Sequence, residues 1–170
     1  MRSLPTIYKG KEYRSSTEAR WHAYFDLIGF EVNHEQDAYE VNGRNYLPDF
    51  QSVNGAFPDH KCGPHSNIPW FVEVKGCVDD ALDNLQLMKD FSKQTQSLVQ
   101  LVWGKPSIKP FPTWIKGEEV MTSSLTHYGF TKKGWTEPYW THDEHPTNGD
   151  LAVLDILRCA KRTRKGELIV

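Results

Sequence analysis

Residues 70–75 form a short apolar segment that carries a glutamate and a lysine, and this combination strongly constrains the fold. If the segment is a strand, Glu73 and Lys75 project to the same face, about 6.6–6.8 Å apart along the strand. Val72 and Val74 then point to the opposite face, into apolar packing. A strand this apolar is expected to be central in a sheet, where two ionisable side chains cost folding free energy unless another group compensates them. The segment therefore predicts a sheet with a charged centre on its middle strand.

Helices and further strands are predicted around this segment. Ser15 and Glu18 match a capping box, which predicts a helix over residues 17–28. Asn42 and Gly43 lie between two extended runs and predict a hairpin turn. Strands are expected at residues 30–35, 38–41, 45–51, 70–75 and 97–103. A second helix is expected from Asp79 or Asp80 to about residue 95. This order predicts an α/β fold with a mixed central sheet.

The chain length of 170 residues suits a single domain, and a 38% hydrophobic content suffices for a packed core. Residues 1–104 are expected to form the core. Residues 105–170 are expected to be a loop-rich extension that ends in a helix over residues 150–165 and packs on the same domain. The sequence has no apolar run that could cross a membrane, no secretory signal and three widely spaced cysteines, which favours the cytoplasm.

Asp49, which follows Pro48, is the second carboxylate that bears on the charged centre. A divalent cation held by Asp49 and Glu73 would compensate the buried charge, because Mg²⁺ is typically bound by one or two carboxylates plus waters and substrate phosphates. Lys75 would lie beside it and orient a water molecule or stabilise charge on phosphorus. Such a group of residues suits metal-assisted phosphodiester hydrolysis. The alternatives are that Asp49 is a turn residue and that Glu73 and Lys75 form a surface ion pair.

The pattern of Pro48-Asp49 followed by Glu73-Val74-Lys75 resembles the PD-(D/E)XK nuclease superfamily. The local sequences at residues 13–21, 46–50 and 72–75 resemble those of small phage and prophage proteins of this superfamily. The resemblance covers roughly residues 6–104. It implies a restriction-endonuclease-like core of a helix, a three-stranded meander, a helix and a strand. It also implies a Mg²⁺- or Mn²⁺-dependent endodeoxyribonuclease encoded by a phage or prophage, and DNA as the partner.

The same resemblance assigns roles to single residues. Asp49 and Glu73 would be metal ligands, together with the backbone carbonyl of Val74, and Lys75 would position the attacking water or neutralise charge. Glu18 would join the metal site from the first helix, directly or through water, although the capping box alone would also explain a glutamate there. Gln86 is the candidate for an additional polar residue from the second helix.

Basic residues near the end of the chain are candidates for contacts with DNA phosphates. The formal net charge of −2 excludes a basic coat over the whole protein but allows a local patch. Arg14 and Arg20 flank the capping box and would contribute. The candidates in the C-terminal segment are Arg158, Lys161, Arg162, Arg164 and Lys165. The alternative is that these bases complement the dipole of a terminal helix.

Two other functions remain open from the sequence: an inactive nucleic-acid-binding module with a nuclease-like fold, and a phage factor that binds proteins. A homodimer is one arrangement that would cut both strands of a duplex. His60, Cys62 and His65 invite a zinc site, but structural zinc requires four ligands and only three cluster here, so we interpret them as loop residues.

Overall fold

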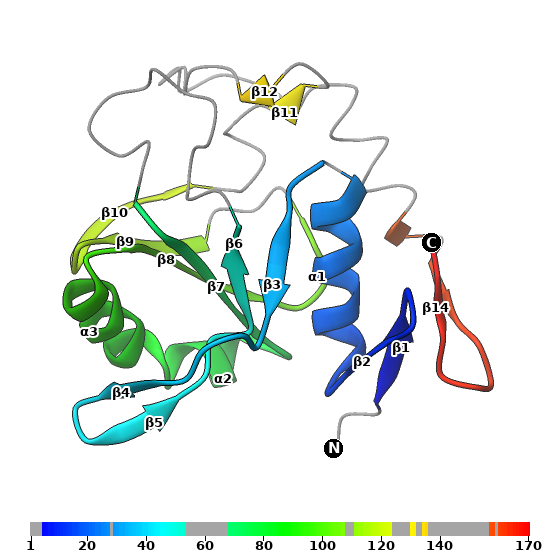
Figure 1. The fold of residues 1–170 in the computed structure, drawn as a ribbon, viewed down its shortest axis with the longest axis horizontal. Helices are drawn as coiled ribbons and strands as arrows, with labels where there is room; N and C mark the ends of the chain where they lie inside the picture. Colours follow the sequence, from blue (N-terminus) through cyan, green and yellow to red (C-terminus); the bar gives the residue numbers. More distant parts are fainter. Residues whose placement is uncertain are drawn as a thin grey trace.

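A six-stranded mixed sheet forms the centre of the fold in the computed structural model, which describes residues 5–27, 29–53, 68–107, 111–123, 130–131, 134–135, 157–158 and 160–170 (Figure 1). The strand order is β10-β9-β8-β7-β6-β3. These strands are β3 (Val32–His34), β6 (Phe50–Ser52), β7 (Trp70–Lys75), β8 (Leu98–Trp103), β9 (Phe111–Ile115) and β10 (Glu118–Ser123). β7 and β8 are parallel, and the other neighbouring pairs are antiparallel.

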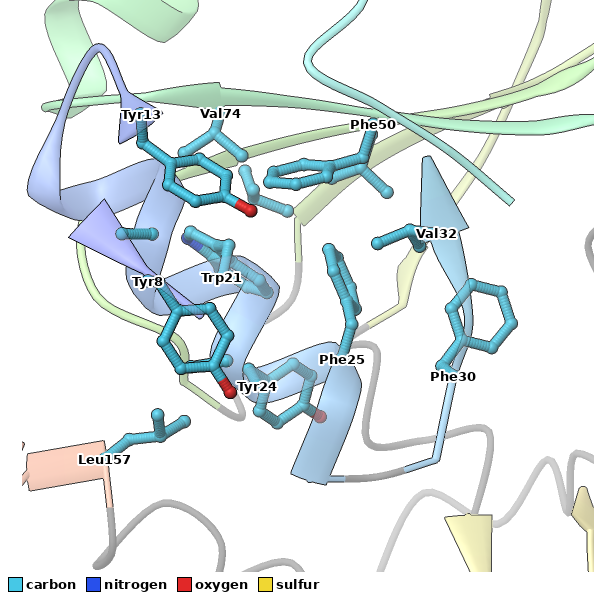
Figure 2. Packing of buried hydrophobic residues seen from close by; sticks show 14 of the residues in the cluster. Tyr8, Tyr13, Trp21, Tyr24, Phe25, Phe30, Val32, Phe50, Val74 and Leu157 are labelled. Atoms are coloured by element: carbon cyan, nitrogen blue, oxygen red, sulfur yellow. The ribbon is translucent and has the colours of Figure 1, made fainter. Parts of the chain in front are cut away.

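Helices cover both faces of this sheet. On one face, α1 (Ser16–Leu27) buries Trp21 and Phe25 against a cluster that includes Phe50, Trp70 and Val74 (Figure 2). On the other face lie α2 (Val78–Leu82) and α3 (Leu85–Thr95). The second cluster contains Val41, Tyr46, Phe71, Ala81, Met88, Phe91, Val99, Leu101 and Trp114. Because adjacent residues of β7 contribute to different clusters, β7 is buried on both faces, as a central strand must be.

Short hairpins surround the three layers. They are β1 (Thr6–Tyr8) with β2 (Lys11–Tyr13), β4 (Tyr39–Val41) with β5 (Arg44–Tyr46), β11 (Phe130–Thr131) with β12 (Gly134–Trp135), and β13 (Lys161–Arg162) with β14 (Leu168–Ile169). Asn42 and Gly43 form the β4–β5 turn with φ of 51° and 74°, which confirms the predicted hairpin. The β13–β14 hairpin lies against the N-terminal one, since the Ile7 N–H donates to the Gly166 carbonyl at 2.8 Å (Figure 1).

Two predicted elements are divided in the structure. The strand expected at residues 45–51 becomes β5 and β6, because Pro48 has no N–H for a ladder and the chain turns at Asp49 before β6 begins. The helix expected at residues 79–95 becomes α2 and α3. Asn84 separates them, and its side chain donates to the Asp80 carbonyl at 2.7 Å, a local bond that competes with a continuous helix.

The prediction of a terminal helix through residue 165 is wrong for the described residues, because residues 161–162 and 168–169 pair as strands. Their turn contains Gly166, whose φ of 91° is unsuited to a helix. The described part of the segment after residue 104 adds β9 and β10 to the sheet. Pro112 is accommodated in β9 because the β9–β10 register shifts opposite it, between Val120 and Ser123.

The α/β class, the mixed sheet and the helix predicted at residues 17–28 are confirmed. Within the described parts of the chain, no helix is long and apolar enough to cross a membrane.

Candidate active site

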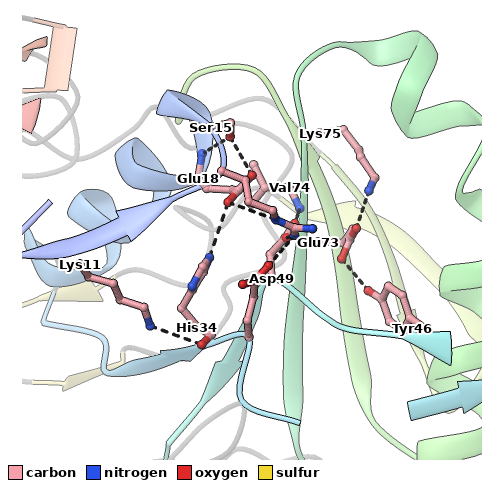
Figure 3. A network of polar contacts seen from close by, with 11 residues as sticks. Lys11, Ser15, Glu18, His34, Tyr46, Asp49, Glu73, Val74 and Lys75 are labelled. Carbon is pink, nitrogen blue, oxygen red and sulfur yellow. Dashed lines mark hydrogen bonds and ion pairs between the residues drawn. The ribbon is translucent and has the colours of Figure 1, made fainter. Parts of the chain in front are cut away.

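Glu73 and Lys75 lie on the same face of β7, as the alternation of the strand predicts. Lys75 Nζ donates to Glu73 Oε1 at 2.5 Å, and the Tyr46 hydroxyl donates to Glu73 Oε2 at 2.6 Å (Figure 3). Glu73 is 4% exposed, so both of its oxygens are desolvated and both have a donor. Tyr46 is itself fixed by packing against Phe91, with ring centroids 4.9 Å apart. The orientation of the Glu73 carboxylate is therefore set by two donors from different strands.

Asp49 lies where the chain enters β6, next to the end of β7. Its Oδ2 accepts the Val74 N–H at 2.7 Å, and its Oδ1 accepts from the Arg14 guanidinium at 2.8 Å. Burial raises the pKa of Asp49 well above its usual range, and the nearby charges of Glu73 and Glu18 raise it further. The bond from Val74 opposes this effect only in part. A carboxyl group in this environment favours positive charge beside it.

Glu18 enters the same region from the first turn of α1. The Ser15 Oγ accepts the Glu18 N–H at 3.1 Å and caps the helix, while the Ser15 hydroxyl donates to Glu18 Oε1 at 2.8 Å. The other oxygen, Oε2, lies 3.5 Å from Nε2 of the buried His34. Burial opposes ionisation of Glu18, but the contacts with His34 and Ser15 and the charge of Arg14 lower its pKa. Capping and a place in the site are thus compatible, since they use different atoms of Glu18.

The arrangement brings the predicted acidic residues and the lysine to one place. In Figure 3, Asp49 lies between the Glu18–His34 pair and the group formed by Glu73, Lys75 and Tyr46. Val74, whose N–H donates to Asp49, lies between Glu73 and Lys75 in β7, and Arg14 contacts both Asp49 and Glu18. α1, the β5–β6 link and β7 therefore converge on one charged centre.

Arg14 occupies the centre of this group rather than its edge. Its guanidinium lies 2.8 Å from Asp49 Oδ1 and 2.7 Å from Glu35 Oε1, and its Nε lies 4.0 Å from Glu18 Oε2. We predicted Arg14 from the sequence as a phosphate contact. The structure shows that it pairs with acidic side chains from three different parts of the chain.

Oxygen donors of this kind suit Mg²⁺ or Mn²⁺, because hard cations prefer carboxylates and water. Carboxylates of Asp49, Glu18 and Glu35 already gather around one positive group, and in this respect they fit such an ion. In the described residues, however, no three histidine, cysteine or acidic side chains are arranged closely enough to hold a metal in this conformation. Binding would require the carboxylates to rearrange around the ion. For Val74, the observed contact is the N–H bond to Asp49, and a role for its carbonyl stays a prediction.

The structure identifies three site residues to which the sequence reasoning gave no role: His34, Glu35 and Tyr46. The signal for the first two was strand pairing. β3 and β6 are antiparallel with His34 opposite Phe50, and the Glu35 N–H donates to the Asp49 carbonyl at 3.0 Å. A register for these two strands would have placed residues 34 and 35 beside Asp49. Tyr46 had no comparable signal, because its neighbour Glu73 is distant in sequence.

The other predicted site residues lie elsewhere. Gln86 is exposed on α3 and donates to Asp90 at 2.9 Å, whereas Met88 of the same helix contacts the Tyr46 hydroxyl through its sulfur at 3.5 Å. Arg20 donates to the carbonyls of Leu157 and Ala160, at 3.0 Å each, and thereby attaches the C-terminal segment to α1.

The C-terminal bases lie in and next to the β13–β14 hairpin rather than on a helix. Arg162 donates to the Pro5 carbonyl at 2.6 Å, and Arg158 is helical and precedes the hairpin. Lys161, Arg164 and Lys165 are exposed, and we refer to these three residues as the basic hairpin. His60, Cys62 and His65 lie outside the described residues.

The chain matches no family model, no curated protein and no solved structure in comparisons with known proteins.

Proposed function

We propose that this protein is a metal-dependent nuclease of the PD-(D/E)XK type that hydrolyses DNA phosphodiester bonds and is encoded by a phage or prophage. One observation carries the proposal: Glu18, Asp49, Glu73 and Lys75 come from three separate elements and lie together near the end of β7, where the Val74 N–H holds Asp49 and Arg14 links Asp49 with Glu18. Burying three carboxylates together is unfavourable for folding, and a chain that needed only stability would place apolar residues there. A cation-binding function explains the arrangement.

In the proposed reaction, each of these residues would have a separate role. Asp49 and Glu73, with Glu18, would hold Mg²⁺ or Mn²⁺, which supplies a Lewis acid for the phosphate oxygens and lowers the pKa of a bound water. Lys75 would position the attacking water, because its ammonium is held at the strand end by Glu73 and its side chain is 24% exposed. The water oxygen would form a bond to phosphorus, and the bond from phosphorus to the 3′ oxygen would break. The products would be a 5′-phosphate and a 3′-hydroxyl.

Two positioning residues support this centre. Val74 holds Asp49 through its N–H, and Tyr46 holds Glu73 through its hydroxyl. The exposed basic hairpin would contact DNA phosphates and supply affinity that depends on salt rather than on sequence. A homodimer would place two such centres on the two strands of a duplex.

The test is cleavage of labelled linear duplex, single-stranded and branched DNA, with Mg²⁺, with Mn²⁺ and with EDTA. Asp49→Asn and Lys75→Met are the informative variants, because each removes one group of the centre with little change of volume. Asp83→Asn and Lys89→Met are matched controls, since both residues are exposed on the surface near α2 and α3.

We expect the wild type and both controls to cleave only with metal, and both site variants to be inactive but folded. If the folded wild type cuts none of these DNAs, the proposal is wrong. A gel shift on the same DNAs would then show whether the chain is a binding module instead.

A further inference from the structure

Arg14 has a place in the structure that neither phosphate binding nor simple surface pairing explains. Its guanidinium contacts Asp49 at 2.8 Å and Glu35 at 2.7 Å, and its Nε lies 4.0 Å from Glu18. Asp49 and Glu18 are two of the carboxylates that the proposed function assigns to the metal. A positive side chain of the protein therefore occupies the place where these carboxylates meet.

Glu18 shows that Arg14 does not fully satisfy this cluster. Its Oε2 is buried and makes no hydrogen bond of normal geometry, and its neighbour Nε2 of His34 lies 3.5 Å away. The Arg14 Nε is also too far away, at 4.0 Å, to donate a hydrogen bond to it. A buried carboxylate oxygen without a well-formed hydrogen bond is unfavourable, and a cation bound between Glu18 and Asp49 would relieve it.

Arg14 and Asp49 also differ in how easily their side chains can move. The side chain of Arg14 is 64% exposed and belongs to the bend between β2 and α1, so its guanidinium can move into water without disturbing a helix or strand. Asp49 is 2% exposed and is held by the Val74 N–H, so it stays in place. Exchange of the counter-ion would therefore move Arg14 into water, while Asp49 keeps its place and the neighbouring carboxylates close around the ion.

We propose that Arg14 is the internal counter-ion of the metal-free site, that a divalent cation displaces it, and that this competition weakens metal binding. The inference rests on the proposed function, because it concerns the same carboxylates. It explains how the buried acidic residues are compensated in the absence of metal. It also predicts that removing the positive charge tightens metal binding, by about tenfold or more, since like charges a few ångströms apart repel strongly at a partly buried site.

The test is calorimetric titration of the metal-free full chain with MnCl₂. The variants are Arg14→Gln, which removes the charge, and Arg14→Lys, which keeps the charge but lacks the planar guanidinium whose Nη2 contacts both Asp49 and Glu35. Lys9→Gln is the matched control, because Lys9 also pairs with a carboxylate on α1, at 2.8 Å, but this carboxylate belongs to Asp26.

We expect Arg14→Gln to bind Mn²⁺ about tenfold more tightly or better, Arg14→Lys to show a smaller gain, and Lys9→Gln to match the wild type. Without metal, Arg14→Gln should also melt at a lower temperature, and Mn²⁺ should raise its melting temperature more than that of the wild type. If folded Arg14→Gln binds Mn²⁺ no more tightly than the wild type, while the wild type binds and cleaves, this inference is wrong and the proposed function stands. If the folded wild type binds no Mn²⁺, both are wrong.

If Arg14→Gln does not fold, a second measurement on the wild type tests whether the metal displaces Arg14. The Nε–H of Arg14 gives its own nuclear magnetic resonance signal, which Arg14→Lys identifies by its loss. Titration with Mg²⁺ should shift this signal to the position of a solvated arginine as the site fills. A signal that stays unchanged at saturating Mg²⁺ would show that Arg14 is not displaced.

Discussion

Replacing Tyr46 by phenylalanine tests whether the Glu73 carboxylate is held in place by its two donors. The hydroxyl donates to Glu73 Oε2 at 2.6 Å in a buried setting, and the ring packs on Phe91. Phenylalanine keeps the packing and removes only the bond. Hydrogen bonds to charged groups contribute about 1.5–3 kcal/mol, so the free energy of unfolding should fall by about that amount. Since a positioning residue of a metal ligand typically matters about 10–100-fold, Mn²⁺ affinity or the cleavage rate should fall within that range.

Tyr39→Phe is the matched control for this experiment. Tyr39 also packs on Phe91, with ring centroids 5.0 Å apart, and lies on β4, the neighbouring strand of the same hairpin. Its replacement should change the unfolding free energy little and leave Mn²⁺ affinity unchanged. Urea unfolding, followed by tryptophan fluorescence, and calorimetric titration with Mn²⁺ measure the two quantities. If Tyr46→Phe and Tyr39→Phe have the same unfolding free energy and the same Mn²⁺ affinity, the Tyr46 hydroxyl does not hold Glu73 in place.

Three further predictions concern capping, pH and salt. Ser15→Ala removes the cap of α1 and should lower the free energy of unfolding, measured by urea titration, by about 1 kcal/mol. Ser15→Thr keeps the capping hydroxyl and should retain the stability of the wild type. Burial, with the charge of Asp26, raises the pKa of Tyr8 to about 12, and burial, with the charge of Glu73, raises that of Tyr46 well above its usual range. Because the unfolded chain loses these protons first, near pH 10, stability should decline as pH rises from about 10 toward 12; a flat profile over that range would contradict this. Neutralising the basic hairpin should reduce the dependence of DNA affinity on salt, which gel shifts at several salt concentrations measure, and an unchanged slope would exclude this surface.

Local patterns predicted the centre of the fold. The apolar run around Glu73 and Lys75 identified β7 with its observed bounds, and the Ser15 cap identified α1 to within a residue. Both signals depend on residues close in sequence, where alternation and capping follow directly from backbone geometry. The same is true of the Asn42-Gly43 turn.

The elements that were missed depend on pairing between distant segments. The spacing of apolar residues over 150–165 predicts a terminal helix, but residues 161–162 and 168–169 pair with each other and lie against the N-terminal hairpin. β9 and β10 lie in a segment that the sequence predicts to be rich in loops, and the shifted register of β10 accommodates Pro112. The positions of Glu35 and Arg14 in the site likewise follow from tertiary packing, since each contacts Asp49, Glu35 through its backbone N–H and Arg14 through its guanidinium, across a gap in sequence that no local pattern spans. In these segments, tertiary contacts override the local secondary-structure propensity.

The most direct test of the central claim is a crystal structure of the protein soaked in MnCl₂, with the ion located by its anomalous scattering. We predict a peak bonded to carboxylate oxygens of Asp49 and Glu73 beside Lys75, and the loss of that peak in Asp49→Asn. A peak at another place in the molecule, or none in a crystal of the wild type at a saturating concentration, would contradict it.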